Sequence, residues 1–264
     1  MRARTTSVFA QSHDAAGAAR TPVELIVEEP MTIRLDGVDI ATTMRTPGDD
    51  FDLAVGFCHA EGVLGGAPVE RIRYCATGSA VDTLFNVVSV ETGGRAPEPR
   101  PRLGTTTSAC GLCGAEAIEA LCDRLSPLVD PPRFAADLLA AMPERLRPYQ
   151  KLFDVTGALH GAAAFDAAGE IVVVREDVGR HNAVDKVVGH LLLERALPAT
   201  SLGLCVSGRA SFEMVQKAWA AGFGAVVAVS APTALAVETA RVAGLQLAAF
   251  ARGDRVTVYS PAPG

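Results

Sequence analysis

Residues 202–250 read LGLCVSGRASFEMVQKAWAAGFGAVVAVSAPTALAVETARVAGLQLAAF. Three short apolar runs, LGLCV, AVVAVS and LQLAAF, alternate here with stretches whose apolar residues recur at helical spacing. Strands as continuously apolar as these are typical of a sheet that is covered on both faces, and a helix between successive strands favours parallel pairing. The stretch therefore predicts an α/β fold with a mostly parallel sheet between two layers of helices.

The regions on either side extend the same pattern. Residues 157–177 predict a hairpin of two apolar strands that turns at Ala168 and Gly169. Helices are predicted over residues 134–146 and 182–196, and a last strand over residues 255–260. We therefore expect residues 105–264 to form one α/β domain that begins with a cysteine-containing loop.

A smaller α+β unit is predicted ahead of this domain, over residues 21–104. Residues 21–46 alternate apolar and polar residues around an Asp-Gly turn, which is typical of two paired strands, and residues 47–64 predict a helix. Two further short strands and a linker rich in Pro, Gly and Arg complete the unit. Residues 1–20 are rich in Ala, Arg, Thr and Ser without periodicity, so we expect them to be a disordered tail.

The composition narrows the classes of function. The 264 residues contain 24 Lys and Arg against 30 Asp and Glu, a formal net charge of -6. A general nucleic-acid binder needs a basic face to neutralise phosphates, so we expect no nucleic-acid partner. No apolar run reaches the roughly 18 residues of a membrane span, and the first 20 residues lack a continuous hydrophobic region of signal-peptide length. We therefore expect no membrane partner and a cytoplasmic location.

The six cysteines fall into two groups. A reducing cytoplasm disfavours disulfides, and four of the cysteines lie in apolar strand or helix patterns, where they are expected to be small buried residues. These four are Cys58, Cys75, Cys122 and Cys205. Cys110 and Cys113 differ, because their neighbours are glycines and hydroxyl residues and they stand at the start of a predicted helix.

The pair Cys110 and Cys113 permits three kinds of chemistry. A zinc site needs four ligands, and the sequence supplies neither a second CxxC nor a spaced pair of histidines. A dithiol redox couple fits the spacing, although the aromatic and proline neighbours of thioredoxin-like sites are absent. Sulfur transfer by a nucleophilic thiol fits equally well, because the following helix would stabilise a thiolate or persulfide and the flanking glycines predict an exposed, mobile segment. The residues alone leave redox chemistry and sulfur transfer open.

A second cluster of polar residues follows the predicted strands. Loops at the carboxyl ends of parallel strands meet at one edge of the sheet and lead into helix N-termini with free N–H groups. Small residues there let backbone approach a ligand, and arginines can bind phosphate oxygens in pairs. The cluster predicts a phosphate-bearing ligand, such as a nucleotide. Its residues are Arg180 and His181, Ser207 and Arg209, Ser230, and the loop 252–255.

Ordinary structural roles compete with this interpretation. Glu213 and Lys217 fit an i,i+4 pair that keeps a helix soluble. His181 and Asp185 lie one helical turn apart and could act as acid and base, and His160 could face the same site, but lone histidines more often have packing or hydrogen-bonding roles.

Several long motifs resemble a known family. ACGLCG, TGALHGAAAFDAAGEI, REDVGRHNAVDKVVG, SGRASFEMVQKAWAAG, SAPTALAVETA and LAAFARGDRVTVY together are similar to the formate dehydrogenase accessory sulfurtransferase family, FdhD. The earlier stretch TPGDDFDLAVGFCHAEGVL also resembles the amino-terminal part of that family. The likeness runs from about residue 22 to residue 260.

This resemblance implies a function and a set of partners. The family receives persulfide sulfur from a cysteine desulfurase and passes it to the molybdenum or tungsten bis-molybdopterin guanine dinucleotide cofactor of a formate dehydrogenase. It also implies a homodimer whose carboxyl-terminal domain is similar to the cytidine deaminase fold, with a pocket that can take a GDP-like nucleotide. The His-x-Glu segment of zinc deaminases is not evident here, so the likeness in fold does not imply deamination.

The resemblance also assigns residues. The persulfide-carrying CxxC maps onto Cys110 and Cys113, with Cys110 as the usual carrier. We expect Cys113 to assist release by thiol exchange. The family's proposed cofactor-binding segment maps onto Phe250, Ala251, Arg252, Gly253, Asp254 and Arg255. Two other functions remain as alternatives: a chaperone that delivers the cofactor without carrying sulfur, and a nucleotide-binding redox sensor.

Overall fold

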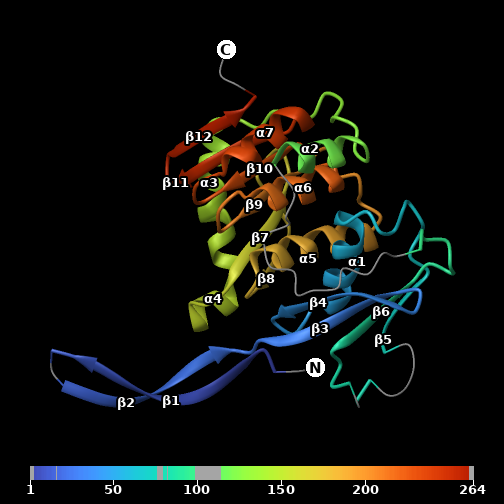
Figure 1. Cartoon of the computed structure of the whole chain (residues 1–264). Coiled ribbons are helices and arrows are strands. Elements are labelled where there is room, and N and C mark those ends of the chain that lie inside the picture. Colours follow the sequence, from blue (N-terminus) through green and yellow to red (C-terminus); the bar gives the residue numbers. More distant parts are fainter. Residues whose placement is uncertain (1–2, 16, 76–79, 82, 99–113, 262–264) are drawn as a thin grey trace.

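The computed structural model describes residues 3–15, 17–75, 80–81, 83–98 and 114–261. Three β-sheets occur in these residues: one of six strands in the upper part of the molecule, one of four strands below it, and a two-stranded hairpin that projects from the base (Figure 1).

The six-stranded sheet has the order β12-β11-β10-β9-β7-β8. Its strands are β7 (His160–Phe165), β8 (Ile171–Asp177), β9 (Gly203–Val206), β10 (Ala225–Ala228), β11 (Gln246–Arg252) and β12 (Arg255–Ser260). The β9-β10 and β10-β11 pairs are parallel, whereas β7 pairs antiparallel with both β8 and β9, and β12 pairs antiparallel with β11. The sheet is therefore mixed, and the prediction of a mostly parallel sheet was wrong. The reason is that the predicted hairpin strand β7 lies between β8 and β9 instead of at an edge.

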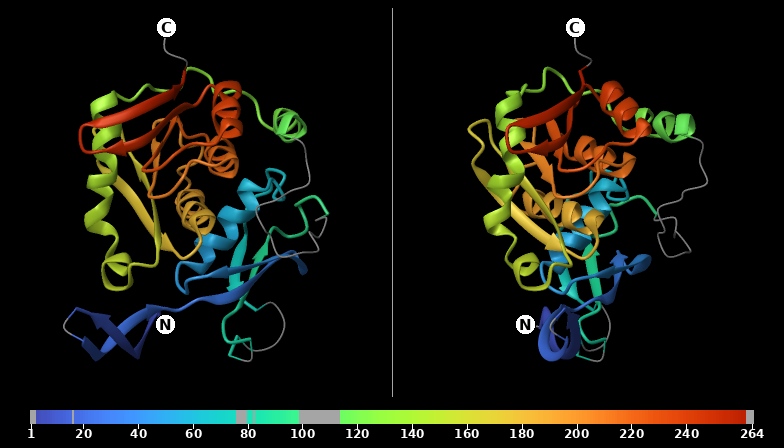
Figure 2. Two further views of the ribbon diagram at one scale, coloured as in Figure 1. Left: turned by 60° about the vertical axis from the view of Figure 1, so that its left-hand side comes forward. Right: turned by 90° about the vertical axis from the view of Figure 1, so that its left-hand side faces the viewer.

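Helices cover both faces of this sheet, which confirms the predicted layers (Figure 2). One core joins the strands to α5 (Arg180–Leu193), α6 (Phe212–Ala221) and α7 (Ala234–Ala243). A second core, on the other face, joins them to α3 (Ala136–Leu146). The central strands β7, β9 and β10 are buried on both sides because nearly all of their residues are apolar.

The four-stranded sheet has the order β4-β3-β6-β5 and carries α1 (Asp50–Ala60). Its strands are β3 (Glu29–Leu35), β4 (Val38–Arg45), β5 (Arg71–Tyr74) and β6 (Val87–Glu91). The predicted turn is present, since Asp36 and Gly37 have φ values of 45° and 91° between β3 and β4. Leu53, Ala54 and Cys58 of α1 are buried against this sheet.

The helices α1 and α5 cross at two glycines. A Cβ atom built on Gly56 of α1 would lie 1.8 Å from the carbonyl oxygen of Asp185 in α5, and one built on Gly189 of α5 would lie 1.8 Å from the carbonyl oxygen of Asp52. The two backbones therefore touch, and only glycine fits at either position. This crossing joins the four-stranded sheet to the six-stranded one.

The first strands form an extended hairpin, which we call the arm. β1 (Thr5–Asp14) pairs antiparallel with β2 (Gly17–Ile26) over ten residue pairs. The prediction of a disordered tail over residues 1–20 was therefore wrong for the described part of that range. Its composition offers little apolar surface for a core, but strand pairing satisfies the backbone hydrogen bonds without one.

The remaining helices are α2 (Gly114–Cys122), the 3-10 turn η1 (Arg147–Tyr149) and α4 (Lys151–Thr156). None of the helices in the described residues is long and apolar enough to cross a membrane.

Three of the four cysteines predicted to be buried are buried, namely Cys58, Cys75 and Cys205. Burial raises the pKa of the Cys205 thiol to about 12, and it also raises the pKa of Cys58. Cys122 is exposed, so that prediction was wrong. The helical stripe on which it was placed is buried at Ile118 and Leu121 instead.

His59 makes the stability of the fold depend on pH. Burial between α1 and α6 lowers its pKa, and its Nε2 lies 2.9 Å from the carbonyl oxygen of Ala220. The unfolded chain therefore binds a proton more readily, and stability is lost as the pH falls below about 6.5 towards the folded-state pKa, by ~1.4 kcal/mol for each unit of depression.

We expect the free energy of unfolding, measured in urea at pH 7 and at pH 5, to fall less in His59→Gln than in the wild type. The pKa of His160 is also lowered, so the same measurement on His160→Gln shows how much of the loss of stability between pH 7 and pH 5 comes from His160 and not from His59. An equal loss in wild type and His59→Gln would contradict the assignment.

Candidate functional site

The carboxyl ends of β8, β9, β10 and β11 meet at one edge of the six-stranded sheet, because these four strands run in the same direction. The loops at this edge contain the residues that the sequence predicted. Arg180 and His181 begin α5, Ser207 and Arg209 follow β9, and Ser230 follows β10. The convergence of these loops on one edge is confirmed.

Hydrogen bonds tie neighbouring loops together along the edge. The hydroxyl of Ser207 accepts a hydrogen bond from the backbone N–H of Gly161 at 2.9 Å, and the N–H of Ser207 donates to the carbonyl of Gly161. The N–H of Ser230 donates to the carbonyl of Gly208, and that of Phe250 donates to the carbonyl of Ser230. The loops from β7 to β11 therefore form one connected surface.

Arg180 and His160 approach each other above Gly208. A Cβ atom built on Gly208 would lie 3.5 Å from Nδ1 of His160 and 3.9 Å from Cδ of Arg180. Burial lowers the pKa of His160, and the nearby Arg180 lowers it further, so the imidazole is neutral at pH 7. Nε of Arg180 is buried and has no hydrogen-bond partner among the described residues.

His181 pairs with a residue that the sequence analysis did not select for the site. Its Nε2 lies 2.5 Å from Oε2 of Glu213 in the first turn of α6, an ion-pair distance, although the contact is not aligned as a hydrogen bond. Contact with His181 lowers the pKa of Glu213. Asp185, the predicted acid-base partner of His181, instead contacts Lys217 and is buried. The only signal for Glu213 in the sequence was its position just after the loop that contains Arg209.

Two helix N-termini at this edge lack side-chain caps. Neither Gly179 before α5 nor Ser211 before α6 makes a capping hydrogen bond, and the buried hydroxyl of Ser211 has no partner among the described residues. By contrast, Thr233 caps α7 by accepting from the N–H of Ala236. Uncapped N–H groups with a helix dipole behind them favour an anion. The arrangement can bind phosphate.

The segment 250–255 lies at the far end of the edge. Phe250 is half exposed and has a φ of 53°, which is strained for an aromatic residue, whereas Ala251 is buried. Gly253 and Asp254 form the turn between β11 and β12, residues 252–255 are all exposed, and Gly253 lies near Glu144 of α3. From β8 to β11 the edge spans four inter-strand spacings, roughly 19 Å, which is long enough for an extended ligand.

Comparison with known proteins decides the family. Residues 26–263 match the model of the FdhD/NarQ family. The chain belongs to the FdhD/NarQ family. A sulfur carrier protein FdhD from Mycolicibacterium paratuberculosis is 48% identical over 269 residues, which cover 98% of both chains. Another, from Streptomyces avermitilis, is 50% identical over 92% of this chain and 90% of its own.

A solved structure supports the fold of this FdhD/NarQ member. A crystal structure from Desulfotalea psychrophila, assigned provisionally as a formate dehydrogenase accessory protein, has a TM-score of 0.76 and 24% identity. The match covers 98% of each chain.

Cys110 and Cys113 of this FdhD/NarQ chain lie outside the described residues. The described chain resumes with α2, whose Leu121 joins the core beside α5, α6 and α7. Beyond α2, the carbonyl of Ser126 accepts a hydrogen bond from Nε1 of Trp219 in α6. The segment that follows the cysteines is thus anchored on the α6 face of the sheet.

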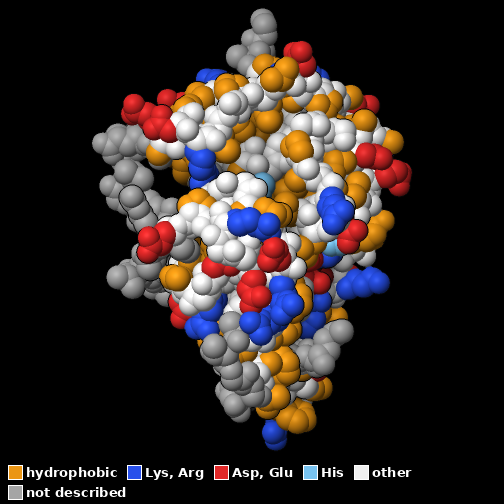
Figure 3. Space-filling view, turned by 90° about the vertical axis from the view of Figure 1, so that its right-hand side faces the viewer, with side chains coloured by type: hydrophobic (Ala, Val, Ile, Leu, Met, Phe, Trp, Pro, Cys, Tyr) orange, Lys and Arg blue, Asp and Glu red, His pale blue; other side chains and the backbone are white. Residues whose placement is uncertain are grey.

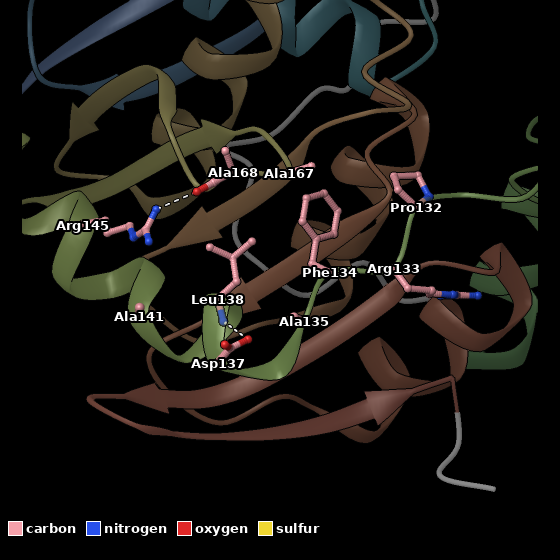
Figure 4. Close-up of a pocket in the computed structure, with 10 residues that line it drawn as sticks. All are labelled: Pro132, Arg133, Phe134, Ala135, Asp137, Leu138, Ala141, Arg145, Ala167 and Ala168. Carbon is pink, nitrogen blue, oxygen red and sulfur yellow. Dashed lines mark hydrogen bonds between the residues drawn. The ribbon is translucent and has the colours of Figure 1, made fainter.

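Two other surfaces of this FdhD/NarQ chain resemble a binding site less than the carboxyl edge of the six-stranded sheet does. A cavity of about 500 Å³ lies between the start of α3 and the β7-β8 turn, at the opposite end of these strands from His160 (Figure 4). Of the predicted site residues that the structure describes, none lines it. On the face in Figure 3, acidic and basic side chains are interspersed, unlike the basic stripe of a nucleic-acid binder.

Proposed function

We propose that this FdhD/NarQ chain is a cytoplasmic sulfurtransferase in formate dehydrogenase maturation. It takes persulfide sulfur from a cysteine desulfurase and transfers it to the bis-molybdopterin guanine dinucleotide cofactor of the enzyme, and it acts as a homodimer. The observation that carries the proposal is the near full-length similarity to relatives described as sulfur carrier proteins, together with the CxxC pair. The cytidine deaminase-like fold is part of the same proposal.

The sulfur is carried by Cys110. Its thiolate attacks the outer sulfur of the donor persulfide, a new S–S bond forms, and the donor's S–S bond breaks, so the desulfurase leaves as a thiolate. This step has no net oxidation.

Release requires two electrons, because persulfide sulfur must become sulfide before it binds the metal. The thiolate of Cys113 attacks the inner sulfur, which belongs to Cys110, and a Cys110–Cys113 disulfide forms. The outer sulfur leaves as sulfide with the electron pair of the broken bond. The two thiolates supply the electrons, and a dithiol reductant restores the pair for the next cycle.

The cofactor substrate binds along the carboxyl edge of the six-stranded sheet. Its phosphates lie at the uncapped starts of α5 and α6, near Arg180 and Arg209, and the segment Phe250–Arg255 holds its other end. Three observations support this placement: Nε of Arg180 and the hydroxyl of Ser211 are buried without a hydrogen-bond partner in the described part of the chain, and the edge is about 19 Å long. A GDP-like nucleotide would occupy part of the same edge.

Intact-mass spectrometry tests the carrier role. After incubation with a cysteine desulfurase and cysteine, we expect the wild type to gain the mass of one sulfur atom and Cys110→Ala to gain none. Cys122→Ala is the matched control, because Cys122 is an exposed thiol in the following helix and should leave the adduct intact.

A second readout separates the carrier from a chaperone. Cys110→Ala should bind GDP with the affinity of the wild type yet reduce activation of formate dehydrogenase at least 100-fold, whereas a chaperone would still deliver active cofactor. Loss of two hydrogens without added sulfur would indicate a redox sensor. No adduct on any form would overturn sulfur transfer.

A further inference from the structure

The arm projects from the rest of the molecule. Figure 1 shows it extending from the base of the fold, away from both large sheets. Among the described elements of the body, α4 contacts β2, and Glu24 and Ile26 of β2 are half-buried. The family model begins at residue 26, where the arm ends, so the arm lies outside the segment that identifies the family.

The two faces of the arm differ in chemistry. In an antiparallel pair, directly opposite residues share a face, and alternate pairs take alternate faces. One face consists of the pairs Thr6 and Leu25, Val8 and Val23, Ala10 and Thr21, Ser12 and Ala19, and Asp14 and Gly17. Apart from Asp14, at the tip of the hairpin, these residues are uncharged, and we call this the uncharged face. The other face includes Glu24, Arg20 and His13, and Phe9, whose ring lies 4.5 Å from the Arg20 guanidinium.

The uncharged face points away from the body. Glu24 and Ile26, the half-buried residues at the base of β2, both belong to the charged face. On the uncharged face Leu25 is 45% exposed, and Val8 and Val23 are each 38% exposed. An isolated two-stranded ribbon is marginally stable in water, and an apolar face without cover adds no burial to stabilise it. A cover on this face would therefore stabilise the arm.

We propose that the cover is a second copy of this chain, in a two-fold dimer where each arm lays its uncharged face on the body of the other copy. This inference rests on the homodimer of the proposed function and assigns its interface. Exposed apolar side chains that can receive an arm lie at Val155 of α4, the helix that contacts β2, and at Tyr149 of η1 and Val172 of the edge strand β8. A two-fold axis brings that region of each copy to the other's arm.

The area decides between two ways of pairing the copies. Ten residues per strand make each arm face roughly 33 Å long and, with two strands, roughly 10 Å wide, about 330 Å². Two arms stacked only on each other would bury about 660 Å², which is below the ~1,200 Å² of a stable interface. Two arms that each cover an equal area of the other body bury about 1,300 Å², which is within that range.

Sedimentation velocity on the full-length protein tests the proposal. The wild type should sediment as a dimer at micromolar concentration, and Val8→Lys/Val23→Lys should raise the dissociation constant at least 100-fold. Ser7→Lys/Gln11→Lys is the matched control, because it adds the same charge to the same hairpin on the other face. This control should remain dimeric.

Hydrogen exchange gives a readout that needs no variant. Amides of residues 5–26 should exchange more slowly above the dissociation constant than below it, since an uncovered ribbon opens readily.

The outcomes distinguish the inference from the function. A monomeric wild type overturns both the arm interface and the homodimer, while the persulfide adduct on Cys110 is tested independently of either. A dimer that survives Val8→Lys/Val23→Lys, or that shows no concentration-dependent protection of the arm, overturns the arm interface alone.

Discussion

Gly56→Ala will lower the free energy of unfolding by at least about 3 kcal/mol, at the upper end of what overpacking costs in a core. The added methyl would meet the carbonyl oxygen of Asp185 at 1.8 Å, and the nearest atoms are backbone, which cannot rotate away. The helices α1 and α5 would have to separate, and the start of α5 carries Arg180 and His181 to the candidate site. Urea denaturation followed by circular dichroism measures the loss.

Gly37→Ala is the control for this prediction. Its φ of 91° makes alanine strained there, but a Cβ atom would meet nothing within 4 Å, so we expect a smaller loss of about 1–2 kcal/mol. Gly189→Ala should resemble Gly56→Ala, and the double variant should cost less than the two together, because the first methyl already separates the helices. A change below 1 kcal/mol for Gly56→Ala would refute the close crossing.

The part of the fold that the sequence predicted is the part determined locally. Continuous apolar strands, helical periodicity and turn residues such as Asp36 and Gly37 are properties of short segments, and the elements they predicted are present. The order of the strands in the sheet is not determined by short segments. Whether β8 or β7 lies next to β9 depends on how α5 crosses the sheet, so the predicted parallel majority failed at β7.

Most of the features that could not be predicted from the sequence involve residues that are far apart along the chain. Gly56 and Gly189 are far apart in sequence, and either glycine alone indicates only a position of low helix propensity. Residues 1–20 are predicted to be a disordered tail because they show no periodicity, yet in the structure residues 5–14 pair with residues 17–26. The edge of the site was predictable because strand direction brings its loops together, whereas the contact between His181 and Glu213 was not.

A similar error concerned Lys217. The spacing of Glu213 and Lys217 predicts an i,i+4 surface pair, but Lys217 is buried, and its Nζ lies 2.7 Å and 2.9 Å from the two carboxylate oxygens of Asp185. Burial raises the pKa of Asp185 to about 6 even with the ammonium beside it. Burial lowers the pKa of Lys217, but Asp185 and Glu61 raise it by more. The lysine thus stays charged and compensates a carboxylate that burial disfavours.

Lys217→Met will therefore destabilise the protein by about 3–5 kcal/mol at pH 8, because it leaves the Asp185 carboxylate buried without a counter-charge. Without Lys217, the folded-state pKa of Asp185 rises further above its unfolded value. Protonation then favours the folded state, so stability is greatest at low pH and is lost as the pH rises through that raised pKa. The deficit of Lys217→Met relative to wild type should consequently be smaller at pH 5 than at pH 8 in urea denaturation.

The double variant Lys217→Met/Asp185→Asn tests the cause. If the cost comes from the uncompensated charge, removing the carboxylate as well should recover much of the loss and abolish its dependence on pH. If it comes from lost packing of the lysine stem between α5, α6 and Phe57, whose ring lies 5.7 Å from Nζ, the double variant should be as unstable as Lys217→Met at both pH values. Equal deficits of the single variant at pH 5 and pH 8 would likewise reject an electrostatic role for the pair.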